Sequence, residues 1–254
     1  MNPTTQSTPL TGKLDSSTPS TDFAGTVLWR IELATFAVLI VLLNLPLLSG
    51  QLDTKFIFLP EAVSAGEWWR VFTFPFVHVS LYHLLLDATA FFILYSELRD
   101  KRRLERFGFM LAAGAGSLLA SIWAAPMIQT HGLCGLSGIA HGLATVSALE
   151  MITSTKSKAV RRVGIASLLL VVGKSAIEAV TGQIAFASWH LGSLGFPIAV
   201  CHAGGVAAAL LAWLCVRAFK RHFSDWKPER GSECRRSAKS PSRHVALTEM
   251  GTNA

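Results

Sequence analysis

Residues His131–Leu143 read HGLCGLSGIAHGL, a polar and glycine-rich stretch that runs directly into an apolar segment. Within it, Ser137 stands between Gly135 and Gly138, and His141 follows Ser137 by four residues. Hydroxyl and imidazole groups are costly in lipid, so such residues in an apolar run are candidates for a functional interior. The position of this stretch relative to a membrane therefore decides how the chain is interpreted.

The composition is that of a polytopic membrane protein. Hydrophobic residues make up 51% and charged residues 15% of the 254 residues, and the mean hydropathy is +0.43. The net charge of +7 comes from basic residues confined to a few blocks, so a nucleic-acid partner is not expected. Between the blocks lie almost uncharged runs of about 20 residues, the length of a helix that crosses a bilayer.

The predicted fold is all-α, a bundle of six transmembrane helices in a lipid bilayer. The expected spans are Val27–Leu48, Leu81–Leu98, Phe107–Ala125, Leu136–Met151, Val163–Val180 and Phe196–Phe219. Residues 1–26, rich in Ser, Thr and Pro, are expected to form a disordered N-terminus. Residues 27–219 form the membrane domain, and residues 220–254 are expected to form a basic, mobile tail.

The distribution of Lys and Arg predicts the orientation. Residues 99–106 contain five, residues 155–162 contain four and residues 217–243 contain nine. The three loops on the other side contain two, none and none. Positive charge stays on the cytoplasmic side, so both termini of this multi-pass protein are expected in the cytoplasm.

Polar residues from separate spans are expected at one depth near the outer surface. His78, His83 and Asp87 lie at the outer start of the second span, and Ser137 begins the fourth. His202 is expected six residues into the sixth span, about 9 Å down a helix that rises 1.5 Å per residue. Ionisable groups at such positions normally face a polar interior, which makes them functional candidates.

Small residues predict that the fourth and sixth spans touch. Gly138 and Gly142 are four residues apart in the fourth span, and Gly205 and Ala209 have the same spacing in the sixth. Such faces let two helix backbones approach closely. Contact there brings Ser137 and His202 within hydrogen-bonding reach, and an adjacent imidazole activates a serine by taking its proton.

Backbone N–H groups at the start of the helix that begins at Ser137 lack partners and are suitable donors to an oxyanion. Each signal also has a simpler interpretation. A GxSG string is common, a lone histidine in an apolar helix is more often structural, and paired glycines are mostly packing faces. The coincidence of all three at one depth favours chemistry.

Four motifs together resemble the rhomboid family of intramembrane serine proteases. GLSG (Gly135–Gly138) resembles the family's GxSG, and CHAGG (Cys201–Gly205) resembles its AHxxG. WWR (Trp68–Arg70) followed by HVSLYHLLLD (His78–Asp87) resembles its WR loop and the helix after it. The resemblance covers all six expected spans in order, and it implies a six-helix fold and proteolysis within the membrane.

The resemblance also implies roles for individual residues. Ser137 is the expected nucleophile and His202 the general base of a Ser–His dyad. His83 and Asp87 occupy the positions from which oxyanion donors are expected, and His78 is expected to hold water or brace the loop. Further supporting or structural positions are Gly135, Arg70 and Gly205.

A subgroup resemblance points to a substrate. His141 in GLSGIAHGL and the sequence GKSAIEAVTG (residues 173–182) are similar to rhombosortases, bacterial enzymes that process proteins with a GlyGly-CTERM sorting signal. The implied partner is a membrane-anchored protein with one C-terminal transmembrane helix, cut near its outer end, in the bacterial inner membrane. Lys174 and Glu178 share a helix face and are expected to form a buried ion pair, with substrate handling as an alternative. His141 is expected to be structural.

The chain departs from the family pattern at Asp87 and Cys201, and also at Ala209, where a Gly is common. Asp87 stands where the family has Asn, and an ionised carboxylate donates no hydrogen bond to an oxyanion; burial that keeps Asp87 protonated would restore a donor. Cys201 stands where the family has Ala. The rival hypothesis is therefore a catalytically inactive rhomboid-like protein that binds transmembrane helices. No cofactor is expected, and no metal either, because the histidines lack a ligand spacing.

Overall fold

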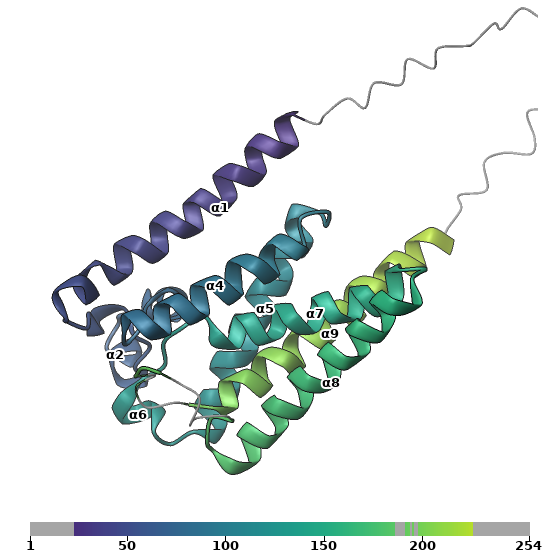
Figure 1. The fold of residues 1–254 in the computed structure, drawn as a ribbon. Helices are drawn as coiled ribbons and strands as arrows, with labels where there is room; N and C mark the ends of the chain where they lie inside the picture. The colour runs from purple at the N-terminus through teal and green to yellow at the C-terminus, as the bar shows by residue number, and fades with distance from the viewer. Residues whose placement is uncertain (1–22, 186–190, 194, 196–197, 226–254) are drawn as a thin grey trace, which may run out of the picture.

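The computed structural model describes residues 23–185, 191–193, 195 and 198–225, and long helices dominate it (Figure 1). The long helices are α1 (Phe23–Asn44), α4 (Leu81–Glu97), α5 (Arg103–Ala124), α7 (Ser137–Ser154), α8 (Lys158–Thr181) and α9 (Val200–Asp225). The short elements are η1 (Leu45–Ser49), η2 (Thr54–Phe56), α2 (Pro60–Ser64), α3 (Arg70–Thr73), η3 (Phe74–Phe76) and α6 (Ile128–His131).

The chain is a multi-pass membrane protein by the length and hydropathy of its helices. Four helical segments are long and apolar enough to cross a bilayer, and a bent pair, α3–η3 with α4, would add a fifth. The four segments are Gly25–Ser49, Arg103–Ala124, Lys158–Thr181 and Val200–His222. Each of the six predicted apolar runs falls mainly in one long helix, but six membrane crossings remain a prediction.

The helix bounds differ from the predicted spans at the two ends of the chain. Helix α1 begins at Phe23, before the predicted boundary at residue 27, and α9 continues to Asp225, beyond residue 219. Phe196, the predicted start of the last span, lies outside the described residues, and α9 begins at Val200. Most of the predicted N-terminal and C-terminal segments also lies outside them.

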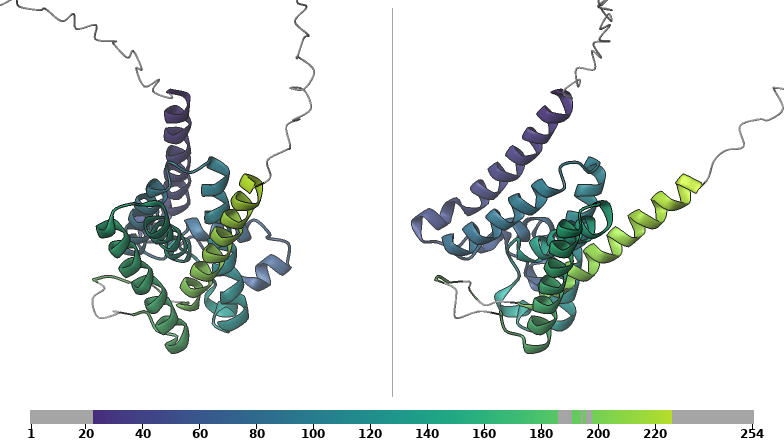
Figure 2. Two further views of the ribbon diagram at one scale, coloured as in Figure 1. Left: turned by 90° about the vertical axis from the view of Figure 1, so that its right-hand side faces the viewer. Right: turned by 45° about the vertical axis from the view of Figure 1, so that its right-hand side comes forward.

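The long helices alternate in direction, so the first residues of α1 and the last of α9 lie at the same end of the bundle (Figures 1 and 2). The basic connections, residues 99–106 between α4 and α5 and residues 155–162 between α7 and α8, lie at this end too. We call it the basic end. The short elements α2, α3, η3 and α6 gather at the opposite end, the loop end.

Helix α7 is the centre of the bundle, because it packs against α4, α5, α8 and α9. Its contact with α9 uses the predicted small-residue faces. A Cβ added to Gly205 would lie 2.0 Å from the carbonyl oxygen of Gly138, and one added to Gly142 would lie 2.9 Å from that of Gly205. The two backbones are therefore in direct contact, and the predicted meeting of these helices is confirmed.

Helix α1 lies at the edge of the bundle (Figure 1) and is held by side chains. The Phe36 ring contacts Phe91 and Tyr95 edge-on, with 5.3 Å between centroids in both pairs. Buried Glu32 accepts hydrogen bonds from Tyr95 and from Arg106, the latter at 2.9 Å. A charge without a partner at this depth would be costly, so this network ties α1 to α4 and α5.

Candidate active site

Ser137 is the first residue of α7, and the loop before it is fixed at both ends. Leu133 pairs with Phe58 through backbone hydrogen bonds of 2.9 and 3.0 Å, and the N–H of Gly135 donates to the carbonyl of Phe74 at 3.0 Å. Gly135 has φ +100°, a conformation that residues with a side chain rarely adopt. The glycine before the serine thus permits the turn that starts α7.

The start of α7 offers donors to an anion. The first N–H groups of a helix have no acceptor within the helix, and no side chain caps the start of α7. These groups belong to Ser137 and the residues directly after it. Such a helix start stabilises negative charge, including the oxyanion of an acyl-transfer reaction.

His202 lies in the first turn of α9, and Ser137 and His202 line one cavity of about 660 Å³ at the loop end. The cavity is also lined by His83, Asp87 and Lys174, together with apolar residues such as Leu86 and Ile198. The expected depth of His202, six residues into a helix, was wrong because α9 begins at Val200 rather than at Phe196. His202 is nevertheless at the level of Ser137, since each residue lies in the first turn of its helix.

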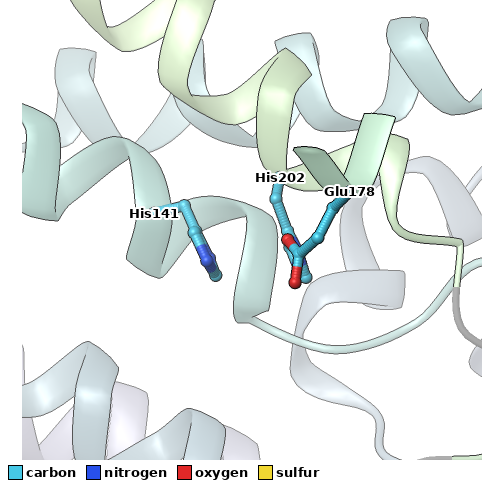
Figure 3. Close-up of side chains that lie close together, drawn as sticks. All are labelled: His141, Glu178 and His202. Atoms are coloured by element: carbon cyan, nitrogen blue, oxygen red, sulfur yellow. The ribbon is translucent and has the colours of Figure 1, made fainter. Parts of the chain in front are cut away.

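His202 is buried and held on two sides. Its Nδ1 lies 2.6 Å from Oε2 of Glu178 on α8. The ring of His141, one turn after Ser137, stacks on it with 4.0 Å between centroids and an interplanar angle of 12°. Figure 3 shows the side chains of His141, Glu178 and His202 gathered from three helices. The imidazole of His202 therefore has a fixed position and orientation.

The predicted ion pair between Lys174 and Glu178 is confirmed, with 2.7 Å between Nζ and Oε1. Both residues do more than was predicted. Lys174 Nζ also lies 3.0 Å from Nε2 of His141, and His141 Nδ1 lies 2.7 Å from the carbonyl oxygen of Ser137. A chain of contacts thus leads from the backbone of the serine to the imidazole of His202.

The hydroxyl of Ser137 contacts a thiol. Its Oγ lies 3.9 Å from Sγ of Cys201, the residue that stands where the family motif has Ala. Within the described part of the chain, no hydrogen bond joins Ser137 to His202. The Ser–His hydrogen bond expected from the sequence is therefore not formed in this conformation. Catalytic hydrogen bonds are often long or misaligned before substrate binds, so this geometry alone does not decide activity.

Asp87 sits among polar groups beside Gly135. Its Oδ2 lies 3.2 Å from Nε2 of His83 and 3.5 Å from Nε2 of His78. A Cβ on Gly135 would lie 2.9 Å from the same oxygen, so the pair of His83 and Asp87 adjoins the loop before Ser137. His78 is fully buried and is not among the residues that line the cavity, which fits bracing better than holding water.

Comparison with protein families matches residues 65–219 to the Rhomboid domain. The match covers more than half of the chain. This chain belongs to the rhomboid family. The family consists of intramembrane serine peptidases, and the motifs used to predict Ser137 and His202 lie inside the matched region. A search of curated proteins finds no match.

An imidazole N–H such as that of His83 can donate to an oxyanion, whereas an ionised carboxylate such as that of Asp87 cannot. His83 Nε2 lies 3.2 Å from Asp87 Oδ2 and would lie 3.0 Å from a Cβ on Gly135, beside the loop before Ser137. Its Nδ1 is buried and has no hydrogen-bond partner among the described residues. Both side chains line the cavity that Ser137 also lines. Nε2 is therefore the nitrogen of His83 that adjoins this loop, and Asp87 lies where it can orient the ring.

Replacement of these two residues is expected to have unequal effects. His83→Ala should lower the rate of peptide cleavage about 10²-fold or more, the usual cost of losing an oxyanion donor. Asp87→Asn keeps the shape of the side chain and should change the rate by about tenfold at most. The measurement is cleavage of a membrane-anchored reporter in detergent, with His222→Ala at the exposed basic end as the control. Equal losses at both positions would contradict this assignment.

Arg70 anchors the loop end of the rhomboid domain by contacts with side-chain and backbone groups. It is buried, pairs with Glu67 at 2.6 Å and donates to the carbonyls of Thr54 and Ile57 at 2.5 and 2.7 Å. These contacts tie α3 to the segment that pairs with Leu133. These contacts support the segment next to the loop before Ser137.

A group of potential metal ligands does form, contrary to the view of the histidines as scattered. Ligand atoms of His141, Glu178 and His202 lie within 4.8 Å of one another. The ammonium of Lys174, however, contacts both His141 and Glu178. A positive charge already lies between two of the three ligands, and it repels a metal cation. This charge distribution suits a site in which side chains transfer protons better than a site that binds a metal ion.

Glu178 is the residue whose importance the sequence reasoning missed. It was paired with Lys174 by spacing, and nothing linked it to His202. A depth comparison could have found it: Glu178 lies near the loop end of α8, while Ser137 and His202 open α7 and α9. The three residues are therefore at one level of the bundle.

Proposed function

We propose that this chain is an intramembrane serine endopeptidase in which Ser137 is the nucleophile and His202 the general base. The observation that carries the proposal is the position of both residues at the first turns of two touching helices, in one cavity at the loop end. A rotation of the Ser137 side chain away from Cys201 is the local change that brings its hydroxyl to the imidazole.

The reaction follows from this arrangement. His202 Nε2 takes the proton of Ser137 as Oγ attacks the substrate carbonyl, and negative charge develops on the carbonyl oxygen. The N–H groups at the start of α7 and the Nε2–H of His83 stabilise that oxygen. The proton then passes to the leaving amine as the C–N bond breaks, and water attacks the acyl-enzyme in the same way.

The proposed orientation places the cavity on the outer face of a bacterial inner membrane. The basic connections, the first residues of α1 and the last residues of α9 lie at the basic end. Positive charge favours the cytoplasmic side. The cavity lies at the opposite end. A single-span substrate would therefore be cut near its outer end.

The proposed substrate class is a protein with a C-terminal Gly-Gly element, one apolar helix and a short basic tail, as processed by rhombosortases. His141, Lys174 and Glu178, which carried that resemblance, all line or adjoin the cavity. Glycines before the substrate helix lack side chains and leave its backbone accessible. This property suits cleavage in a cavity that helices enclose.

Co-expression in bacteria tests the proposal. A reporter with the Gly-Gly element, an apolar helix and a basic tail is expected to lose its tail with the wild-type protein and not with Ser137→Ala. A second reporter with Val-Val in place of Gly-Gly and the same helix should be processed poorly. Equal processing of both would indicate a general rhomboid protease, and processing that survives Ser137→Ala would remove the nucleophile assignment.

The rival function, an inactive rhomboid-like protein that binds transmembrane helices, has two observations in its favour. Ser137 Oγ contacts the thiol of Cys201 rather than His202, and Asp87 replaces the Asn of the family pattern. Such a protein would bind the reporter helix without cutting it.

A further inference from the structure

Glu178 is buried completely in a helix that exposes many of its apolar residues. Its neighbours Ile177 and Val180 are 59% and 87% exposed, whereas Glu178 is 0% exposed. Exposed apolar residues suit lipid, but a buried carboxylate is costly unless it is paired and hydrogen-bonded. The position of Glu178 therefore needs an explanation beyond the packing of α8.

All hydrogen-bonding directions of this carboxylate that the structure describes lead to fixed partners. Oε1 accepts from Lys174 at 2.7 Å and from the backbone N–H of Ala185 at 2.9 Å. Oε2 lies 2.6 Å from Nδ1 of His202. Two contacts thus fix the carboxylate, and the third delivers one oxygen to the histidine (Figure 3).

This geometry determines the protonation pattern of the two stacked histidines. A carboxylate accepts, so Nδ1 of His202 carries a proton and Nε2 is its acceptor nitrogen. The carbonyl of Ser137 likewise places a proton on Nδ1 of His141, whose Nε2 then accepts from Lys174. Of the two histidines, only His202 has an acceptor nitrogen that Lys174 does not contact, and only its Nδ1 faces a carboxylate.

We propose that Glu178 is a positioning residue for His202, which makes the site a Ser–His–Glu triad with its third member on α8. This inference rests on the proposed function. When His202 takes the proton of Ser137, a buried imidazole becomes a cation. The adjacent carboxylate stabilises that cation and holds the ring in the productive tautomer, while the Nδ1 proton stays on His202.

Lys174 balances the charge of the resting site. Without it, Glu178 would be a buried anion beside a neutral imidazole; with it, the pair is neutral before the reaction starts. Lys174 also holds His141 against the face of His202. Its effect on the base is therefore indirect, through two neighbours, whereas that of Glu178 is direct.

The test is the kcat and KM of reporter cleavage by the purified full chain in detergent. Glu178→Gln removes the charge and offers an amide N–H toward Nδ1, which favours the wrong tautomer. We expect kcat to fall about 10⁴-fold with KM nearly unchanged, as for loss of the carboxylate in serine-protease triads. Glu178→Asp, which retains the charge, should recover part of kcat. Glu97→Gln, at an exposed glutamate near the basic end, is the matched control.

A purely structural role for Glu178 predicts a different pattern. If the residue only secures α8 through its ion pair, Lys174→Gln should cost as much kcat and as much thermal stability as Glu178→Gln. If Glu178→Gln alone does not fold, Lys174→Gln/Glu178→Gln removes both charges and leaves no buried ion unpaired. A folded variant without the carboxylate and with kcat within threefold of wild type would overturn the triad.

The same assay separates this inference from the proposed function. Cleavage by wild type that Ser137→Ala abolishes, together with full activity of the Glu178 variants, refutes the triad and leaves the protease. Absence of cleavage by folded wild-type protein on any single-span reporter refutes both.

Discussion

Incubated with a fluorophosphonate probe in detergent, the wild-type protein is expected to be labelled covalently at Ser137. The rate of reporter cleavage should fall about 10⁴-fold or more in Ser137→Ala and in His202→Ala. The double variant should lose no more activity than either single variant. The physical reason is that nucleophile and base act as one unit. The hydroxyl is a weak nucleophile without the imidazole, and the imidazole has nothing to activate without the hydroxyl.

Cys201→Ala provides the informative companion to these variants. It removes the thiol that Ser137 Oγ contacts at 3.9 Å and restores the residue of the family pattern. This variant should be labelled at least as fast as the wild type. Failure of the probe to label folded wild-type protein would support the inactive, helix-binding alternative. Labelling that persists in Ser137→Ala would remove the assignment of Ser137 as the nucleophile.

Gly205→Ala is expected to have the largest effect on stability. The new Cβ would lie 2.0 Å from the carbonyl oxygen of Gly138 and 2.8 Å from its carbon. Both atoms belong to backbone, so no side-chain rotation relieves the contact and α9 must move away from α7. Overpacking of this kind costs about 1–3 kcal/mol or more, which corresponds to a drop in Tm of up to about 10 °C. Thermal unfolding in detergent measures this change in Tm.

Gly173→Ala is the matched control on α8. A Cβ there meets no atom within 4 Å, and alanine favours a helix over glycine by about 1 kcal/mol. Its Tm should stay the same or rise. The Gly205 variant should also lose activity in its folded fraction, because α7 and α9 carry Ser137 and His202. A wild-type Tm for Gly205→Ala would contradict the close approach of the two backbones.

The parts of the site that short motifs encode were predictable. The GLSG segment places Ser137 at a helix start because Gly135 permits the turn with φ +100° before it. The small-residue faces of α7 and α9 were predicted to meet because only small residues permit the backbone approach, and they do meet. A comparison of depths would have placed Glu178 at the level of His202, but the contact between the two side chains could not be predicted. Helix α8 is apolar on several sides, so its sequence does not fix its rotation about its own axis.

The sequence by itself determined the helical fold, the membrane environment and the two motifs, because apolar runs, basic connections and glycine pairs act locally. Only the tertiary structure decided which polar groups meet. It turned Glu178 toward His202, Lys174 toward His141 and the Ser137 hydroxyl toward Cys201. These pairings depend on the rotation and depth of α7, α8 and α9 against one another. Packing across the whole bundle sets those quantities, and no single segment contains them.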